Sequence, residues 1–232
     1  MKKFAFTLAE VLITLGIIGI VAAMTLPSLI TRNQNKALEA GLKKNYSIIQ
    51  QAFEMYQAEH GETLKPEDIG IKKDANNLYN LIKPYFAIIH DCGITYTKCM
   101  PNQGDNSYAD RISSIYTTYN NKTLRLALLD DGQFVLKDGS LILLENSSDA
   151  TDRTRLVSVD VNGINKNPNR WGHDLFTFQL MDDGRILPMG APNTTYIDKN
   201  TYCSQTSTDP YNGIGCTYYA LTDKDYFNNL PR

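Results

Sequence analysis

Glu10 interrupts the most apolar stretch of the chain, and it is the first side chain whose type and position could do chemistry. No other charged residue lies between Lys3 and Arg32. A charge placed centrally in a membrane helix costs about 2.5 to 3.5 kcal/mol on insertion scales. A cation attracts a carboxylate far more strongly in such low-dielectric surroundings than in water. We therefore expect Glu10 to pair with a positive group.

A loop between positions 160 and 174 holds the densest group of oxygen-bearing side chains. Asp160, Asn162 and Asp174 are candidate calcium ligands, because Ca²⁺ takes six to eight oxygen ligands. The loop is not an EF-hand, since Asn165 stands where that motif needs Gly and Trp171 where it needs Glu. Asn and Asp side chains also stabilise turns by bonding their own backbone. Calcium binding and a purely structural loop both remain open at this point.

The residue types of common active sites are present without their motifs. The three histidines, His60, His90 and His173, form no His-Glu-x-x-His pattern, and the chain has no Gly-x-Ser-x-Gly elbow and no glycine-rich phosphate loop. His90, Asp91 and Cys92 are adjacent, but a working Cys–His pair is built in space, and Cys92 fits better as a disulfide partner. We expect a protein that is not an enzyme.

The four cysteines fall into two local pairs, Cys92 with Cys99 and Cys203 with Cys216. Four cysteines allow three connectivities, and pairing of nearest neighbours closes two short loops. Each loop would add about 2.5 to 3 kcal/mol of stability in the chain-entropy model. Zinc binding is disfavoured because no Cys-x-x-Cys or paired histidine accompanies them. Disulfides fit export to an oxidising compartment.

The apolar stretch that holds Glu10 is long enough to cross a membrane. Positions 11 to 31 carry no charge, and 21 residues make about 30 Å of α-helix. Lys2 and Lys3 favour a cytoplasmic N-terminus. Pro27 removes a backbone donor and crowds the preceding turn, so we expect the helix to bend or loosen just before it.

The residues from Ala5 to Glu10 (AFTLAE), followed by the apolar run with Gly16 and Gly19, resemble the N-terminus of type IV pilins and type II secretion pseudopilins. The resemblance implies cleavage by prepilin peptidase between Ala5 and Phe6 and methylation of the new Phe6 amine. It also implies that Glu10 pairs with that amine on a neighbouring subunit. The chain departs from the family at Ala5, where Gly is usual.

The resemblance further implies a place in the cell and a set of partners. The precursor would be a single-pass inner-membrane protein that later joins a periplasmic or cell-surface filament. Its partners would be other pilin subunits, the prepilin peptidase and an inner-membrane assembly platform. The oxygen-rich loop at Asp160 also resembles the calcium-binding loop of some major pseudopilins. Pro27 lies where the family has a helix-kinking proline, a region that partly melts on assembly.

The expected segments are a leader (1–5), a membrane or filament-core helix (6–30), its amphipathic continuation (31–60) and a globular head (61–232). Two other readings of the N-terminus compete with the pilin-like one. A cleaved secretory signal could end near Ala22 and Ala23, but its apolar core should be about 7 to 15 residues long. A plain membrane anchor explains the length of the apolar stretch but not Glu10.

The continuation of the helix should pack on a sheet. Its apolar residues recur at helical spacing and form one stripe: Leu38, Leu42, Ile49, Phe53 and Tyr56. Gly61 supplies a C-terminal stop. We also expect a short helix with Asp74 as N-cap, ended by Pro84, and another within Ser107–Tyr119.

From Thr123 the apolar residues recur with a period of two, which predicts antiparallel strands separated by Asp-Gly turns. The expected strands cover Leu124–Leu128, Phe134–Lys137, Leu141–Glu145, Arg155–Val161, Leu175–Met181 and Arg185–Leu187. One long helix packed on four or five antiparallel strands is an α+β, pilin-like fold.

Composition and charge bear on two alternative functions. The net charge is −2 and the mean hydropathy is −0.32, so no large basic field indicates nucleic-acid binding. A DNA-uptake subunit would need stacking aromatic and basic side chains, for which the candidates are Tyr116, Tyr119, Tyr218, Tyr219, Arg111, Lys122 and Arg125. The remaining alternative is a monomeric, membrane-tethered binding module, for which neither Glu10 nor the cleavage would matter.

Overall fold

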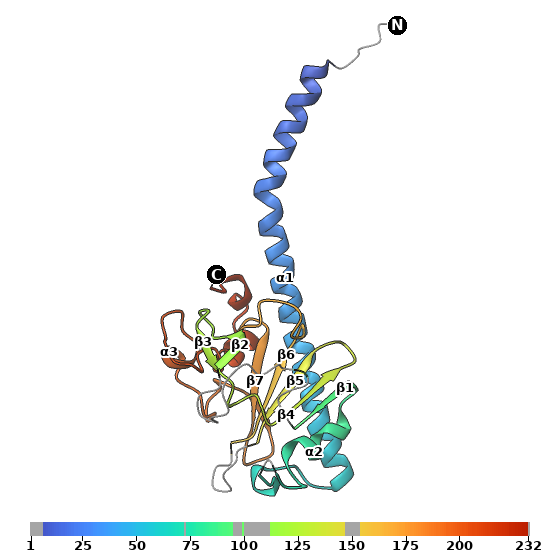
Figure 1. The fold of residues 1–232 in the computed structure, drawn as a ribbon. Coiled ribbons are helices and arrows are strands. Elements are labelled where there is room, and N and C mark those ends of the chain that lie inside the picture. Colours follow the sequence, from blue (N-terminus) through green and yellow to red (C-terminus); the bar gives the residue numbers. More distant parts are fainter. Residues whose placement is uncertain (1–6, 72, 95–98, 100–111, 147–153, 232) are drawn as a thin grey trace. The chain divides into compact units, whose positions relative to one another are not determined.

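The computed structural model describes residues 7–71, 73–94, 99, 112–146 and 154–231 (Figure 1). The helices are α1 (Leu8–His60), α2 (Leu78–Ile82), α3 (Lys199–Tyr202) and α4 (Cys216–Thr222), with 3₁₀ turns η1 (Pro66–Asp68), η2 (Lys83–Tyr85) and η3 (Tyr226–Asn228). The strands are β1 (Ile88–Gly93), β2 (Ile112–Thr117), β3 (Thr123–Arg125), β4 (Gly132–Leu136), β5 (Leu141–Glu145), β6 (Leu156–Asp160), β7 (Leu175–Leu180) and β8 (Ile186–Pro188). The chain forms two compact units, Met1–Ala37 and Leu38–Arg232.

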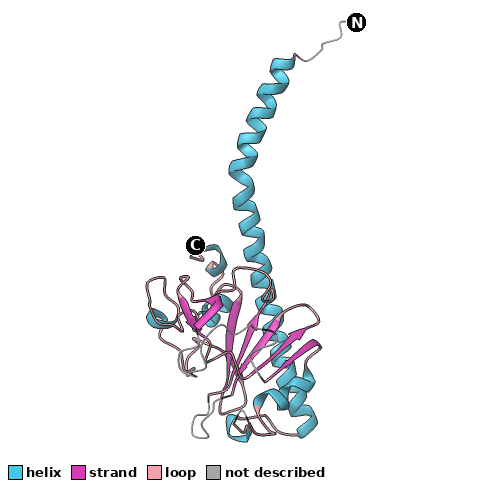
Figure 2. Ribbon diagram, viewed as in Figure 1, coloured by secondary structure: helices cyan, strands magenta, loops and turns pink. Residues whose placement is uncertain are grey.

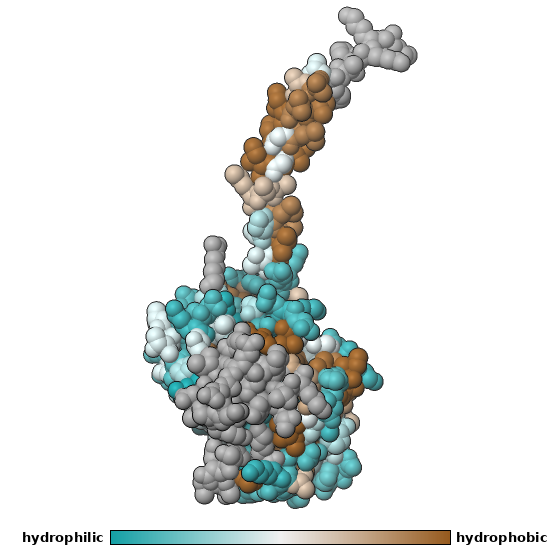
Figure 3. All heavy atoms as spheres, viewed as in Figure 1, coloured by the Kyte–Doolittle hydropathy of each residue, from teal (hydrophilic) through white to brown (hydrophobic). Residues whose placement is uncertain are grey.

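The described part of the first unit is the N-terminal portion of α1. Its apolar side chains are exposed, from Leu8 at 78% to Ile30 at 54% of their possible surface (Figure 3). An 18-residue window of the helix has a mean hydropathy of 2.2 and no buried residue. Within the described residues, α1 is therefore the one helix long and apolar enough to cross a membrane.

The helix α1 continues through Pro27 without interruption. Hydroxyl side chains near the proline bond to backbone carbonyl oxygens, Thr25 to Val21 at 2.9 Å and Thr31 to Pro27 at 3.0 Å. The loosening expected from the sequence is thus absent from the described helix, and Pro27 lies within a continuous α-helix.

In the second unit, the remainder of α1 packs on one face of a sheet. Leu42 and Ile49 are fully buried, while Tyr56 at the end of the predicted stripe is only half-buried. The ring of Tyr46 stacks on that of Phe178 in β7, with 4.9 Å between ring centroids. A Cβ at Gly41 would lie 3.2 Å from that of Val161, so the helix and the sheet approach closely at this glycine.

Among the described residues, the main sheet has six antiparallel strands in the order β1-β4-β5-β6-β7-β8, and with α1 it confirms the α+β class (Figure 2). Successive side chains of a strand point to opposite faces. In β5, Ile142 and Leu144 join the core beneath α1, whereas Leu141 and Leu143 join a second core on the other face. Burial on both faces explains why this strand reads as a continuous apolar run.

The second core lies against a separate two-stranded sheet, β2 with β3. The helix expected within Ser107–Tyr119 is therefore wrong over its described part, where β2 is a strand. Positions 107–111 lie outside the described residues. Tyr116 is buried in this core, so pairing with β3 overrides the helical spacing on which the prediction relied. The strand expected at Leu124–Leu128 is shortened to β3 and does not join the meander.

The short helix after η1 also differs from expectation. α2 begins after Asn77, whose side chain accepts the N–H of Asn80, and not after Asp74. Asp74 instead accepts the backbone N–H of Ile71 at 3.0 Å and so stabilises the preceding turn. Asn and Asp are comparable N-caps, so the choice between them depends on the chain path. Pro84 lies in η2, just beyond the end of α2.

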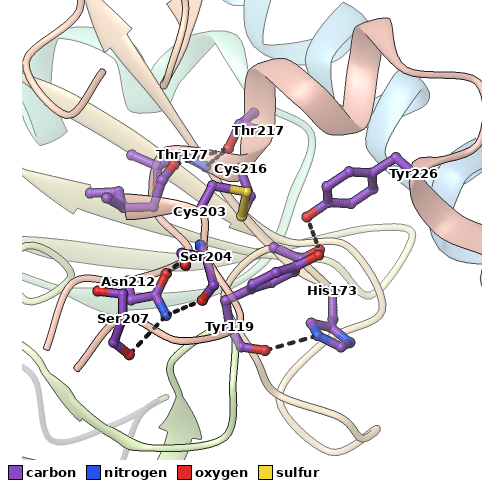
Figure 4. Close-up of a disulfide and its surroundings, with 12 residues drawn as sticks. Tyr119, His173, Thr177, Cys203, Ser204, Ser207, Asn212, Cys216, Thr217 and Tyr226 are labelled. Carbon is purple, nitrogen blue, oxygen red and sulfur yellow. Dashed lines mark hydrogen bonds between the residues drawn. A yellow bond between two sulfur atoms is a disulfide. The ribbon is translucent and has the colours of Figure 1, made fainter. Parts of the chain in front are cut away.

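Both disulfides join nearest neighbours, Cys92 with Cys99 and Cys203 with Cys216, which is one of the three connectivities that the sequence left open. The second bond closes a loop within the C-terminal segment, and the backbone N–H of Thr177 in β7 donates to the hydroxyl of Thr217 in α4 at 2.9 Å (Figure 4). Nearby, the hydroxyl of Tyr226 donates to the carbonyl oxygen of Gly172 at 2.6 Å. These contacts make the C-terminal segment part of the head's core.

Replacing Cys203 and Cys216 together by alanine should lower the free energy of unfolding by about 3 kcal/mol, the chain-entropy value for a loop of this length. The measurement is urea unfolding of the full chain in detergent, followed by the fluorescence of Trp171, which is fully buried. An unchanged unfolding midpoint would mean that packing alone holds the C-terminal segment and that the disulfide contributes nothing to stability.

Candidate functional site

The carboxylate of Glu10 lies at the start of α1 and caps it. The backbone N–H and the hydroxyl of Thr7 both donate to Glu10 Oε2 at 2.8 Å, and the N–H of Glu10 donates to Thr7 Oγ1 at 3.2 Å. This reciprocal pattern is a capping box, which satisfies backbone donors that have no partner within the helix. The Thr-x-x-Glu spacing could have been read from the sequence, so Thr7 is a site residue that sequence analysis missed.

The capping box uses only one of the two carboxylate oxygens. Within the described part of the chain, Oε1 of Glu10 accepts no hydrogen bond, and the residue is exposed. The carboxylate can therefore hold its own helix end with one oxygen and accept from an external cation with the other. Ala5 and Phe6, the predicted processing residues, lie outside the described residues.

The loop between β6 and β7 brings the predicted residues Asp160 and Asp174 close together, both fully buried. Asp160 Oδ2 accepts the hydroxyl of Tyr116 at 2.7 Å, and its Oδ1 accepts the backbone N–H of Gly163 at 2.9 Å. The oxygens of Asp174 accept the backbone N–H groups of Asn169 at 2.8 Å and of Arg170 at 2.7 Å. Tyr116 comes from β2, so this loop is joined to the small sheet.

Two like charges in this buried loop oppose each other. Burial raises the pKa of Asp160, and its hydrogen bonds offset part of that rise. Burial and the neighbouring Asp160 carboxylate both raise the pKa of Asp174. Arg170 and Lys166 supply the positive charges that act on the pair. Burial also lowers the pKa of His173 to about 3, so this histidine adds no compensating charge at neutral pH.

Two amide oxygens in the same loop have no hydrogen-bond partner among the described residues although they are buried, Oδ1 of Asn162 and Oδ1 of Asn169. Buried polar atoms without partners are uncommon and call for an explanation. Like the carboxylates of Asp160 and Asp174 in the same loop, they are oxygen donors of the kind that calcium takes. The hydrogen bonds of the loop fit a structural turn equally well, but such a turn leaves these two oxygens unexplained.

Two other groups of potentially reactive side chains, one at Cys92 and one at Asp131, have structural roles. The sulfur of Cys92 is in a disulfide, so it is not a nucleophile beside His90. Asp130, Asp131 and Glu145 bring carboxylate oxygens within 4.8 Å of one another, a cluster that sequence spacing did not indicate. The backbone N–H of Asn146 donates to Asp131 at 3.0 Å, which gives this cluster a structural role between β4 and β5.

Of the four tyrosines considered for DNA stacking, two are buried and two are half-buried. Tyr116 is fully buried and Tyr119 is 7% exposed. Tyr218 and Tyr219 are half-buried and pack edge to face, with 5.5 Å between ring centroids. The predicted basic residue Arg111 lies outside the described residues. Stacking on successive bases needs exposed ring faces, so the first pair of tyrosines cannot provide it.

No protein-family model, no curated protein and no solved structure matches this chain.

Calcium should raise the melting temperature of the protein by several degrees at pH 8 and by less at pH 5. Because the folded state raises the pKa of Asp160 and Asp174, their protonated form stabilises the fold at low pH, and this contribution is lost as the pH rises through the folded-state values. The unbalanced charge at pH 8 is what a bound cation relieves. The measurement is differential scanning fluorimetry with calcium or with chelator.

The matched variants for this experiment are Asp174→Asn and, as a control, Asp183→Asn, whose carboxylate is exposed and pairs with Arg185 in the β7–β8 turn. Asp174→Asn should abolish the calcium shift and Asp183→Asn should keep it. The lowered pKa of His173 affects the melting temperature equally with calcium and with chelator. Its effect therefore cancels when the two melting temperatures are subtracted. No shift in the wild type, or an equal shift in Asp174→Asn, would favour the purely structural loop.

Proposed function

We propose that this chain is a structural subunit of a type IV pilus or of a type II secretion pseudopilus. The observation that carries the proposal is the combination at the start of α1, an exposed apolar helix whose first turn holds a carboxylate with one unused oxygen. A simple membrane anchor needs the apolar helix and can use the helix cap, but it has no use for the second carboxylate oxygen. Assembly through α1 gives both features a purpose.

The apolar part of α1 cannot remain in water. Between Leu8 and Ile30 the exposed large apolar side chains number 13, and full burial of each is worth about 1.5 to 3 kcal/mol. Lipid or neighbouring helices can provide that burial. Because the two environments are similarly apolar, the transfer from lipid to filament gains little from the hydrophobic effect itself. A polar pairing can therefore decide where the helix goes.

In the proposed pathway the precursor is inserted with Lys2 and Lys3 in the cytoplasm. Prepilin peptidase cleaves between Ala5 and Phe6, and the amine of Phe6 is methylated. Glu10 of one subunit then accepts that amine of a neighbour with the oxygen that the capping box leaves unused. An assembly platform in the inner membrane moves each subunit into a periplasmic or cell-surface filament. The activity of the protein is assembly, and the covalent chemistry belongs to the processing enzyme.

The head from Leu38 onward forms the outer surface of the filament in this proposal. Its two disulfides suit an oxidising compartment outside the cytoplasm. The proposed alternative, a monomeric membrane-tethered binding module, explains the head, the span and the capping box but assigns no role to the second carboxylate oxygen of Glu10. A DNA-uptake subunit is a weaker alternative because Tyr116 and Tyr119 are buried.

Glu10→Ala should leave membrane insertion intact and lower fibre yield by at least about tenfold, since loss of one partner leaves a charge unpaired in apolar surroundings. The measurement is the amount of sheared fibre relative to membrane-bound subunit in the native host. Thr7→Ala is the matched variant, because it removes the hydroxyl bonded to the carboxylate but keeps the charge. Normal fibre yield from Glu10→Ala would contradict the pairing role.

Processing can be tested on the native protein by intact-mass and N-terminal peptide mass spectrometry before and after reduction. We expect a mature chain that begins at N-methylated Phe6 and gains four hydrogens on reduction, two for each of the two disulfides. A chain that keeps Met1, or one cut near Ala23, would remove the pilin proposal and leave a tethered or secreted domain.

A further inference from the structure

A pocket of about 450 Å³ opens between the β2–β3 turn and the loop closed by Cys203 and Cys216. It is lined by Asn121, Lys122, Thr123, Arg125, Thr208 and Pro210. Its volume is within the range of small-molecule sites, about 300 to 1,000 Å³. Two of the lining residues are cationic and none is acidic, whereas the chain as a whole has a net charge of −2. The lining of the pocket is therefore positively charged, although the protein as a whole is slightly negative.

The two cations of the pocket differ in how firmly they are held. Arg125 acts electrostatically on the hydroxyl of Tyr211, whose ring packs edge-on against the buried Trp171, with 6.3 Å between ring centroids. Arg125 thus lies beside a side chain that packs on the second core. Lys122 is exposed, and its ammonium has no bonded partner among the residues that the structure describes. Arg125 provides a fixed charge and Lys122 an adaptable one.

Two carboxylates lie near the pocket without lining it. Asp209 lies between the lining residues Thr208 and Pro210, and its Oδ1 accepts the backbone N–H of Tyr211 at 2.8 Å. Glu145 also acts electrostatically on Tyr211. Neither carboxylate lines the pocket. The anion that Lys122 and Arg125 could bind together must therefore come from outside the pocket.

The wall formed by the disulfide loop is fixed before any ligand arrives. The amide of Asn120 donates to the carbonyl oxygens of Gln205 at 3.1 Å and Ser207 at 2.8 Å, which ties the loop to the β2–β3 turn. Within the loop, the amide of Asn212 donates to the carbonyl oxygen of Ser204 at 2.8 Å (Figure 4). A preformed wall reduces the conformational entropy that binding would otherwise cost.

We propose that this pocket binds an acidic sugar, with a carboxylate or phosphate group held between Lys122 and Arg125. Charge-assisted hydrogen bonds from guanidinium and ammonium groups suit either anion. The hydroxyls of Thr123 and Thr208 and the amide of Asn121 bind the hydroxyls of the sugar ring. This site uses only residues of the head, so it holds whether or not the chain assembles into a filament.

A nucleic acid is the less favoured occupant of this pocket. Strong binding to a phosphate backbone needs several phosphate contacts along the strand, and the pocket offers only Lys122 and Arg125. Sequence-tolerant binding of single strands also needs exposed aromatic faces, whereas Tyr116 and Tyr119 are buried. A compact ligand with one anionic group and several hydroxyls fits the lining better.

The test is calorimetric titration of the full chain in a neutral detergent at low ionic strength, where a surface charge is least screened. The probes are glucuronic acid, glucose 6-phosphate, glucose, inorganic phosphate and a short oligothymidylate. We expect glucuronic acid or glucose 6-phosphate to bind and glucose not to bind. The tighter of the two acidic sugars identifies whether the natural anion is a carboxylate or a phosphate.

Arg125→Gln and Lys122→Gln should each weaken binding of the acidic sugar about tenfold or more, as expected for loss of a hydrogen bond to a charged group. Lys137→Gln is the matched control, because Lys137 is an exposed lysine outside the pocket and its loss should change nothing. Lys122→Gln carries the test if Arg125→Gln lowers the melting temperature through its contact with Tyr211.

Four results would overturn the proposal. Absence of binding by both acidic sugars, or unchanged binding in Lys122→Gln, would remove the pocket as a site. Inorganic phosphate that binds as tightly as glucose 6-phosphate would show that the pocket holds an adventitious ion only. Oligothymidylate that binds more tightly than either sugar would replace the sugar by a nucleic acid as its ligand.

Discussion

The exposed apolar surface of α1 is the constraint on which the rest of the molecule depends. From Leu38 onward the helix buries its apolar stripe on the sheet of its own chain, and before that residue its apolar side chains have no partner within the described chain. The same helix thus takes part in two kinds of packing. The head completes its own core, whereas the N-terminal portion of α1 must find lipid or protein outside the chain.

The head is organised around a sheet that is buried on both faces. α1 covers one face and the small β2–β3 sheet covers the other, while the C-terminal segment contributes to both cores, with Ala220 and Phe227 in the first and Ile214 in the second. Asp160 joins the main sheet to the small sheet, because its carboxylate accepts the hydroxyl of Tyr116 from β2. The candidate calcium loop and the proposed sugar pocket therefore both border the small sheet, and changes in its position would reach both.

The features that were readable from the sequence depend on local periodicity. Short apolar runs located β5, β6 and β7, and Asp-Gly pairs located the turns at Gly139 and Gly184, where φ is positive. The stripe on α1 also followed from spacing alone. The strand β2 did not, because its residues fit a helical period equally well and only the long-range pairing with β3 decides between the two.

The candidate sites divide in the same way. Glu10, Asp160 and Asp174 were identifiable by residue type and position, whereas the hydroxyl of Tyr116, 44 residues from Asp160 in the sequence, is brought to it only by the fold. The unpartnered oxygen of Asn169 and the pocket at Arg125 likewise depend on how distant loops meet. Thr7 was readable from the sequence through the capping-box spacing.

The capping box at the start of α1 also has a mechanical consequence. Because Thr7 and Glu10 satisfy each other, the first turn of the helix is already formed in the isolated chain. In the proposed assembly, a subunit that exchanges lipid for protein neighbours would move with the N-terminal end of α1 already helical. The rate of that exchange would then depend on how often the N-terminal helix ends of two subunits meet.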